Sequence, residues 1–88
     1  MKKAKQLERY FKGASNHNRI NIIMSVYGDP GITLEEITKK VGGNVKTISE
    51  HTRKLVQAGL LNKKYFGHSV AHKLSPYGEK FYKFIKTF

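Results

Sequence analysis

Residues 44–54 carry side chains that could form hydrogen bonds with nucleic acid: Asn44, Lys46, Thr47, Ser49, Glu50, Arg53 and Lys54. Arginine and lysine can donate to phosphates and to the guanine acceptors of the major groove, and glutamate can accept from cytosine N4. The same residues also suit a solvated helix surface, because Lys46 with Glu50 and Glu50 with Lys54 have the spacing of helical ion pairs. From this stretch alone, base reading and simple solubility both remain open.

A helix over about residues 45–58 would position these side chains. Asn44 is a favourable N-cap residue. One face of the helix is expected to point into the core, and it consists of Val45, Ile48, Thr52 and Leu55. Because successive helical residues are rotated by about 100°, the polar side chains then point outward. The helix therefore presents its polar face to solvent or to a partner.

Two further helices are expected before this one, at about residues 16–27 and 34–41. In the first, an apolar stripe of Ile20, Ile23, Met24 and Tyr27 is widened by Ile22 and Val26. A helix that is apolar on so much of its surface should be the buried central one. The second begins with the capping-box pattern of Thr33 and Glu36, directs Leu34, Ile37 and Val41 inward, and ends at Gly42 and Gly43.

A β-hairpin, which we name the wing, is expected at about residues 61–74 around Gly67. Its basic or titratable side chains are Lys63, Lys64, His68 and Lys73. No carboxylate side chain lies between Glu50 and Glu79. Such a hairpin can lie along phosphates or reach the minor groove, where it contributes affinity with little sequence information.

The composition agrees with a polyanion as partner. The 88 residues include 17 Lys and Arg against six Asp and Glu, which gives a formal net charge of +11. This surface favours nucleic acid first and an anionic membrane second, although excess lysine can also serve solubility alone. The length suits a single domain over residues 1–88.

Several classes of protein are disfavoured. The chain has no cysteine, so disulfides and thiolate metal sites are excluded. No phosphate-binding loop or catalytic constellation is present, so we expect no enzyme and no cofactor. His68 and His72 lie close in the hairpin, but no carboxylate supports a zinc site, and we expect a phosphate contact for His68 and partial burial for His72. The first residues, MKKAKQLERYFKG, contain no apolar run, so we expect a soluble, cytoplasmic protein.

The segment TISEHTRKLVQAGLL (47–61) resembles the recognition helix of the ArsR-type winged helix-turn-helix regulators, T-V-S-x-H-L-x-x-L-x-x-A-G-L. NHNRINII (16–23) is similar to that family's H-x-x-R-x-x-I-L, and LSPYGEKF (74–81) resembles the L-T-P-x-G that follows the wing in MarR-like and PadR-like regulators. The resemblance implies a mainly α fold with a small β-hairpin, in the order of four helices, wing and terminal helix. It also implies a homodimeric DNA-binding regulator, often a repressor, in which the seven polar residues named first are the recognition-helix candidates and the four wing residues support them.

The sequence departs from the family at two points. Thr52 stands where the family usually places a core leucine, so packing could be looser, or the hydroxyl could bond back to the helix. The usual metal-sensing sites are absent, because they need cysteines or Asp and His on the terminal helix. His51 is expected to serve packing or a phosphate contact.

Aromatic residues concentrate in two terminal helices, expected at about residues 2–12 and 76–87. A chain of this size has too little interior for all of them, so part of this layer should face a second copy. The expected dimer residues are Leu7, Tyr10, Phe11, Phe81, Phe84, Ile85 and Phe88. The alternative is that these side chains only fold back on their own domain.

The sequence thus favours a dimeric regulator that binds double-stranded, pseudo-palindromic DNA. Two other functions stay open. One is an RNA-binding or architectural basic domain with the same fold, and the other is a protein-interaction module in which the charge is incidental.

Overall fold

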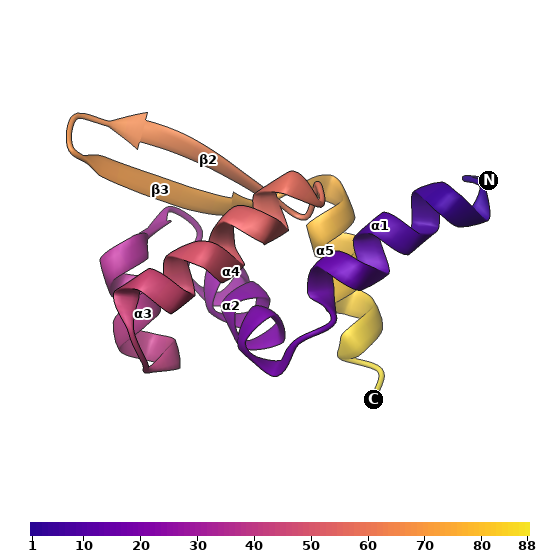
Figure 1. Ribbon diagram of the computed structural model, residues 1–88, viewed down its shortest axis with the longest axis horizontal. Helices are drawn as coiled ribbons and strands as arrows, with labels where there is room; N and C mark the ends of the chain where they lie inside the picture. The colour runs from indigo at the N-terminus through magenta and orange to yellow at the C-terminus, as the bar shows by residue number, and fades with distance from the viewer.

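The computed structural model describes residues 1–88 and contains five helices and three strands (Figure 1). In chain order these are α1 (Ala4–Ala14), α2 (His17–Gly28), β1 (Ile32–Thr33), α3 (Leu34–Val41), α4 (Val45–Gln57), β2 (Leu61–Phe66), β3 (Ser69–Leu74) and α5 (Pro76–Ile85). The predicted fold class is confirmed, with β1 as an addition. None of the helices combines the length and apolar character needed to cross a membrane.

Side-chain caps determine where the helices begin. The Oδ1 atom of Asn16 accepts from the Asn18 amide at 2.8 Å, and α2 starts at the next residue. Thr33 and Glu36 form the predicted capping box, in which the Glu36 carboxylate accepts from the Thr33 amide at 2.9 Å. Ser75 Oγ accepts from the Gly78 amide at 2.9 Å, and Pro76 occupies the first position of α5. Each cap satisfies an amide that the helix itself leaves free.

The central helix α2 is buried over only part of the predicted apolar surface. Ile22, Ile23 and Val26 are fully buried in the core, whereas Met24 and Tyr27 are exposed. The prediction of Met24 and Tyr27 as inward residues was therefore wrong. Residues 22, 23 and 26 define the stripe that is fully buried, while Tyr27 lies at its edge with its ring stacked 3.7 Å from that of Tyr82 on α5.

The predicted inward face of α4 is confirmed for Ile48, Thr52 and Leu55, which are all buried. Val45 was predicted there too, but its side chain is 52% exposed because it lies in the first turn, beyond the reach of the core. The hydroxyl of Thr52 donates to the Ile48 carbonyl at 2.8 Å. Of the two outcomes considered for Thr52, the structure shows the second, in which the hydroxyl bonds back to its own helix. A threonine can therefore occupy this leucine position with its polar atom satisfied.

The three strands form an antiparallel sheet in the order β1-β3-β2. The two-residue strand β1 pairs Ile32 with His72 and so ties the root of the wing to the start of α3. Ile32 is buried, and its carbonyl lies 3.1 Å from His72 Nδ1. The burial of His72 is more complete than predicted, since its exposed fraction is only 4%.

Two glycines allow close contacts between elements. The first helix was expected at about residues 2–12, but α1 continues through Gly13 to Ala14. A Cβ atom on Gly13 would collide with the Cβ of Ala58 at the end of α4, so glycine lets the two helices touch. Gly59 has a φ of 85°, and the Leu60 amide donates to the Leu55 carbonyl at 3.0 Å. This is a Schellman ending, which turns the chain from α4 into the wing.

Figure 1 shows how these elements are distributed along the molecule. The helices α1 and α5 lie together at one end, the tip of the wing projects at the other end, and α4 lies between them. The molecule measures 38 × 26 × 21 Å along its principal axes. The polar face of α4 and the aromatic terminal helices therefore occupy separate regions.

Candidate nucleic-acid interface

The turn between α3 and α4 sets the direction of α4. Gly42 and Gly43 have φ angles of 82° and 107°, a region that glycine enters without a Cβ penalty. Asn44 then caps α4, and its Oδ1 accepts from the Lys46 amide at 2.7 Å. This cap occupies the side-chain oxygen of Asn44, and only the NH2 group of its amide remains available for a partner.

All seven candidate residues on α4 and its cap are exposed: Asn44, Lys46, Thr47, Ser49, Glu50, Arg53 and Lys54. Buried residues on the opposite face hold the helix against the core, so the polar face is available along its length. The helix has no acidic residue in its first turn. Its N-terminal end therefore presents a positive helix dipole that no carboxylate offsets, which favours phosphate.

The ion pair on this face joins Glu50 to Arg53 and not to either of the lysines that the sequence suggested. Arg53 Nη2 donates to Glu50 Oε2 at 2.8 Å. Neither Lys46 nor Lys54 forms the expected ion pair with Glu50. The hydrogen bond from Arg53, together with its charge, lowers the pKa of the Glu50 carboxyl below its usual range. The single carboxylate on this face is therefore held by a cation, and Lys46 and Lys54 are free for other contacts.

His51 anchors α4 to the helices below it. Arg19 Nε donates to His51 Nδ1 at 3.1 Å, and Arg19 Nη1 donates to the Gly13 carbonyl at 3.2 Å. Burial, followed by the nearby Arg19 charge, lowers the pKa of His51. Of the two roles considered for His51, the packing role is the one that this geometry describes. It also links the three helices α1, α2 and α4 through a single guanidinium.

The wing residues divide between two faces of the ribbon. The register pairs Lys63 with His72 and Tyr65 with Val70, so these four side chains share one face. Lys64, Phe66 and Lys73 belong to the opposite face, since side chains alternate along a strand. Lys63, Lys64, His68 and Lys73 are all exposed. The four predicted residues are therefore near one another in sequence, but they do not form a single patch.

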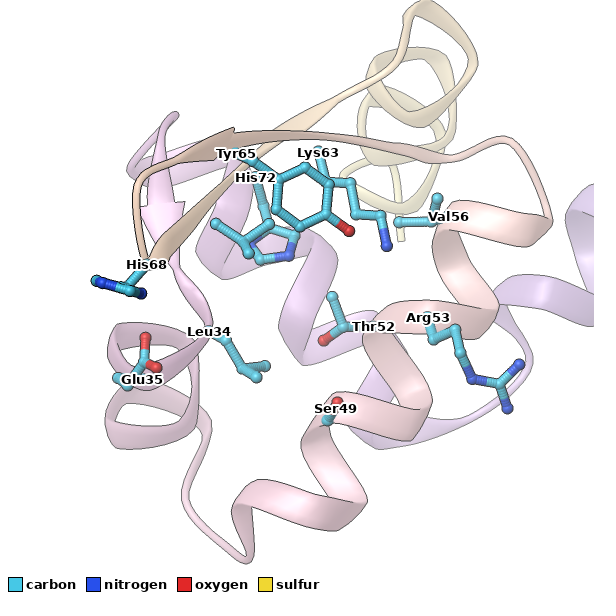
Figure 2. A pocket seen from close by; sticks show the side chains of 11 residues that line it. Leu34, Glu35, Ser49, Thr52, Arg53, Val56, Lys63, Tyr65, His68 and His72 are labelled. Carbon is cyan, nitrogen blue, oxygen red and sulfur yellow. The ribbon is translucent and has the colours of Figure 1, made fainter.

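A small cavity of about 210 Å³ lies where the wing faces α4 and α3. Figure 2 shows Lys63, Tyr65 and His72 on the wing side and Thr52 on the α4 side. The guanidinium of Arg53 points away from the wing in this view. Arg53 and Lys63 both line this cavity, from α4 and from the wing respectively.

His72 has a structural role in the root of the wing. Burial lowers its pKa more than the hydrogen bond with Ile32 raises it, so the neutral ring is favoured. Because a carbonyl only accepts, Nδ1 of the neutral ring must carry the proton that bonds Ile32. Within residues 1–88 no three potential ligands among His, Cys, Asp and Glu come together as a metal site.

Two aromatic residues near the wing tip were missed by the sequence-based selection. Tyr65 and Phe66 are 65% and 57% exposed. The ammonium of Lys63 lies 5.5 Å from the centre of the Tyr65 ring, and that of Lys64 lies 5.2 Å from the Phe66 ring. Their only signal in the sequence was that two aromatic residues directly follow two lysines and precede the turn.

Comparison with protein families identifies the family of the chain. The sequence pattern of the winged helix-turn-helix DNA-binding family matches residues 15–62. The chain belongs to this family. The match runs from the cap of α2 to the start of the wing and so includes α4 completely. A family defined by DNA binding also agrees with the prediction that the protein is not an enzyme. Comparison with curated protein sequences gives no significant match.

Solved winged-helix structures share the whole architecture at low sequence identity. HlyU from Vibrio cholerae N16961 superposes with a TM-score of 0.86 at 18% identity, covering 97% of this chain and 94% of its own. NolR from Sinorhizobium fredii has a TM-score of 0.85 at 18% identity, with coverages of 96% and 84%. Mb0332 from Mycobacterium bovis is described as a homodimeric winged helix-turn-helix domain and a possible ArsR-family regulator. It has a TM-score of 0.84 at 19% identity, and the match covers 94% of this chain and 77% of Mb0332. The resemblance to ArsR-type proteins is thus confirmed for the winged-helix fold.

The predicted dimer residues lie at the end of the winged helix opposite the wing tip. Phe11, Phe84 and Phe88 are exposed, and Leu7, Phe81 and Ile85 are half-buried. Tyr10 departs from the prediction, because it is buried in its own chain with its ring 4.9 Å from that of Tyr77. A largely apolar groove of about 430 Å³ runs between α1 and α5.

Proposed function

We propose that this protein is a homodimeric transcription regulator that binds double-stranded DNA sequence-specifically and acts as a repressor. In this proposal α4 enters the major groove, and the wing contacts the phosphate backbone or the neighbouring minor groove. The observation that carries the proposal is the exposed polar face of α4, in which the single carboxylate is paired with Arg53.

The division of roles follows from the chemistry of each group. Arg53 and Lys46 are candidates to donate hydrogen bonds to the acceptors of guanine, and Glu50 is a candidate to accept one from cytosine N4. Lys63 and Lys64 carry no carboxylate partner within 4.0 Å, so their charge is available to phosphates. The wing would then contribute mainly affinity, and α4 would contribute specificity.

The exposed aromatic layer of α1 and α5 supports a two-fold dimer. Phe84 is 47% exposed, yet its ring lies 6.2 Å from that of Phe81 and 5.2 Å from that of Phe88, so the apolar surface is continuous. Burial of such a surface against a second copy removes it from water. The description of Mb0332 as homodimeric also favours this assembly. A dimer that occupies a promoter would repress by excluding polymerase, with no further activity required.

Selection of bound duplexes from a random pool tests the proposal directly. We expect enrichment of two inverted half-sites, with centres separated by about 34 Å or one helical turn. Affinity for the enriched site should exceed that for random duplex by at least about 1000-fold. A pool without an enriched motif, or equal affinity for every duplex, would refute sequence-specific binding. Half-sites in direct repeat would refute the two-fold dimer.

A further inference from the structure

We propose that Phe66 is a wedge that enters the minor groove of the bound DNA and bends the duplex. This inference rests on the proposed function, because it requires the protein to bind double-stranded DNA. It concerns the shape of the DNA in the complex, which neither the fold nor the family assignment determines.

The first argument is that the fold of the free protein makes little use of the Phe66 ring. The side chain is 57% exposed, and no other aromatic ring packs against it. Across the ribbon its partner is Ser69, which is too small to cover a phenyl group. An apolar side chain so exposed at the end of a strand is available to a partner.

The position of Phe66 at the wing tip is the second argument. Phe66 is the last residue of β2, and only Gly67 and His68 separate it from β3. Gly67 has a φ of 58° at the first central position of this two-residue turn, which keeps the tip narrow. The tip projects beyond the helices (Figure 1). A ribbon tip of this kind can approach a minor groove that is about 6 Å wide.

The charge of the wing indicates that its tip binds the minor groove of DNA. Lys63 and Lys64 precede the aromatic pair, and no carboxylate side chain lies between Glu50 and Glu79. The narrow minor groove of A·T-rich DNA has an enhanced negative potential that attracts such cations. An apolar side chain inserted between base steps from a basic arm is a recognised way to kink DNA.

Lys64 links the free and bound states. Its ammonium lies 5.2 Å from the centre of the Phe66 ring and partly shields the ring from water. In the complex the Lys64 ammonium moves to a phosphate at the edge of the groove. The Phe66 ring is then uncovered and can enter between the stacked bases. Tyr65 is the less suitable wedge, since its ring lies on the face that is turned toward α4 (Figure 2).

The test uses the duplex enriched by selection, labelled at both ends for energy transfer and carrying 2-aminopurine at successive steps beneath the wing. We expect the wild-type protein to bend the duplex by about 20–90° and to raise the 2-aminopurine fluorescence at one step. That step should be a flexible pyrimidine–purine step such as TA.

Matched variants separate the wedge from simple affinity. Phe66→Ala should abolish both the bend and the fluorescence increase, and affinity should fall by about tenfold or less because the bending cost disappears together with the wedge contact. Phe66→Leu should retain both signals, since leucine also serves as a wedge. Lys64→Ala should weaken binding but keep the bend at saturation. Circular dichroism of each variant verifies folding.

The outcomes distinguish this inference from the proposed function. Specific binding without a bend, or an equal bend with Phe66→Ala, overturns the wedge and leaves the proposed function intact. Absence of specific duplex binding by the wild-type protein overturns both.

Discussion

Separate roles for α4 and the wing predict different consequences when one cation is removed from each. We consider Arg53→Ala on α4 and Lys64→Ala on the wing. Both side chains are exposed. The ion pair of Arg53 with Glu50 lies on the surface, where such pairs contribute little to folding. Neither substitution should therefore change the thermal midpoint appreciably, and differences in DNA binding can be interpreted directly.

The magnitude for Lys64→Ala follows from counterion release. Each phosphate contact contributes about 0.9 to the slope of log affinity against log salt concentration. Removal of one contact should lower the slope by that amount. When the salt concentration rises from about 50 to about 200 mM, the ratio of wild-type affinity to variant affinity should therefore fall about 3.5-fold. The loss should be the same for the selected site and for random duplex, because a phosphate carries no sequence information.

Arg53→Ala should behave differently. A bidentate contact to guanine contributes about 1–3 kcal/mol of discrimination, which corresponds to about a 5- to 150-fold loss for the selected site. Binding to random duplex should change far less. In a repeated selection with the variant, the preference should relax at one base pair of each half-site and remain at the others.

Fluorescence anisotropy with the selected site and a scrambled duplex, at several salt concentrations, measures all of these quantities. Lys83→Ala is the matched control, since Lys83 is an exposed lysine on α5 and should leave both the slope and the specificity unchanged. Identical behaviour of Arg53→Ala and Lys64→Ala would refute the assignment of reading to α4 and of backbone contact to the wing. A slope change with Lys83→Ala would show that net charge alone governs binding.

Three further predictions concern the cap, the dimer and acid stability. Asn44→Ala should cost about 1 kcal/mol in urea unfolding because the N-cap of α4 is lost, whereas Asn44→Asp should keep stability and weaken DNA binding by its charge. Phe84→Asp should give a monomer in sedimentation experiments with an unchanged circular dichroism spectrum, since Phe84 is 47% exposed and does not belong to the buried core. The pKa values of His51 and His72 lie below the ordinary 6.5. Their contribution to stability is therefore complete above pH 6.5 and is lost as the pH falls through the lowered values. The urea midpoint should decrease from about pH 7 to about pH 5, and less so in His72→Gln.

Local chemistry made much of the fold predictable from sequence. The caps at Thr33 and Asn44 act within three residues of themselves, so their sequence patterns were sufficient to locate the starts of α3 and α4. The exposed polar face of α4 followed from helical periodicity in the same way. Because these features depend on neighbours in the chain, they do not require knowledge of the tertiary arrangement.

Features that depend on distant neighbours were not predictable in this way. The strand β1 has two residues and exists through its pairing with β3, so no periodicity could reveal it. Met24 has the helical spacing of a core residue, but its side chain stays 50% exposed. The pairing of Lys63 with His72 and of Lys64 with Ala71 required the register of the hairpin, which depends on the turn at Gly67 and His68.

The junction at Ser75 has a consequence for the spacing of the DNA site. Ser75 Oγ donates to the Gly59 carbonyl at 2.6 Å, and its amide donates to the Leu60 carbonyl at 3.0 Å. The end of α4, the root of the wing and the start of α5 are therefore fastened together at Ser75. In the proposed dimer, this junction would hold the two copies of α4 at a fixed distance from each other. The separation of the two half-sites becomes a property of the fold, and an operator lengthened by a few base pairs should be rejected rather than accommodated.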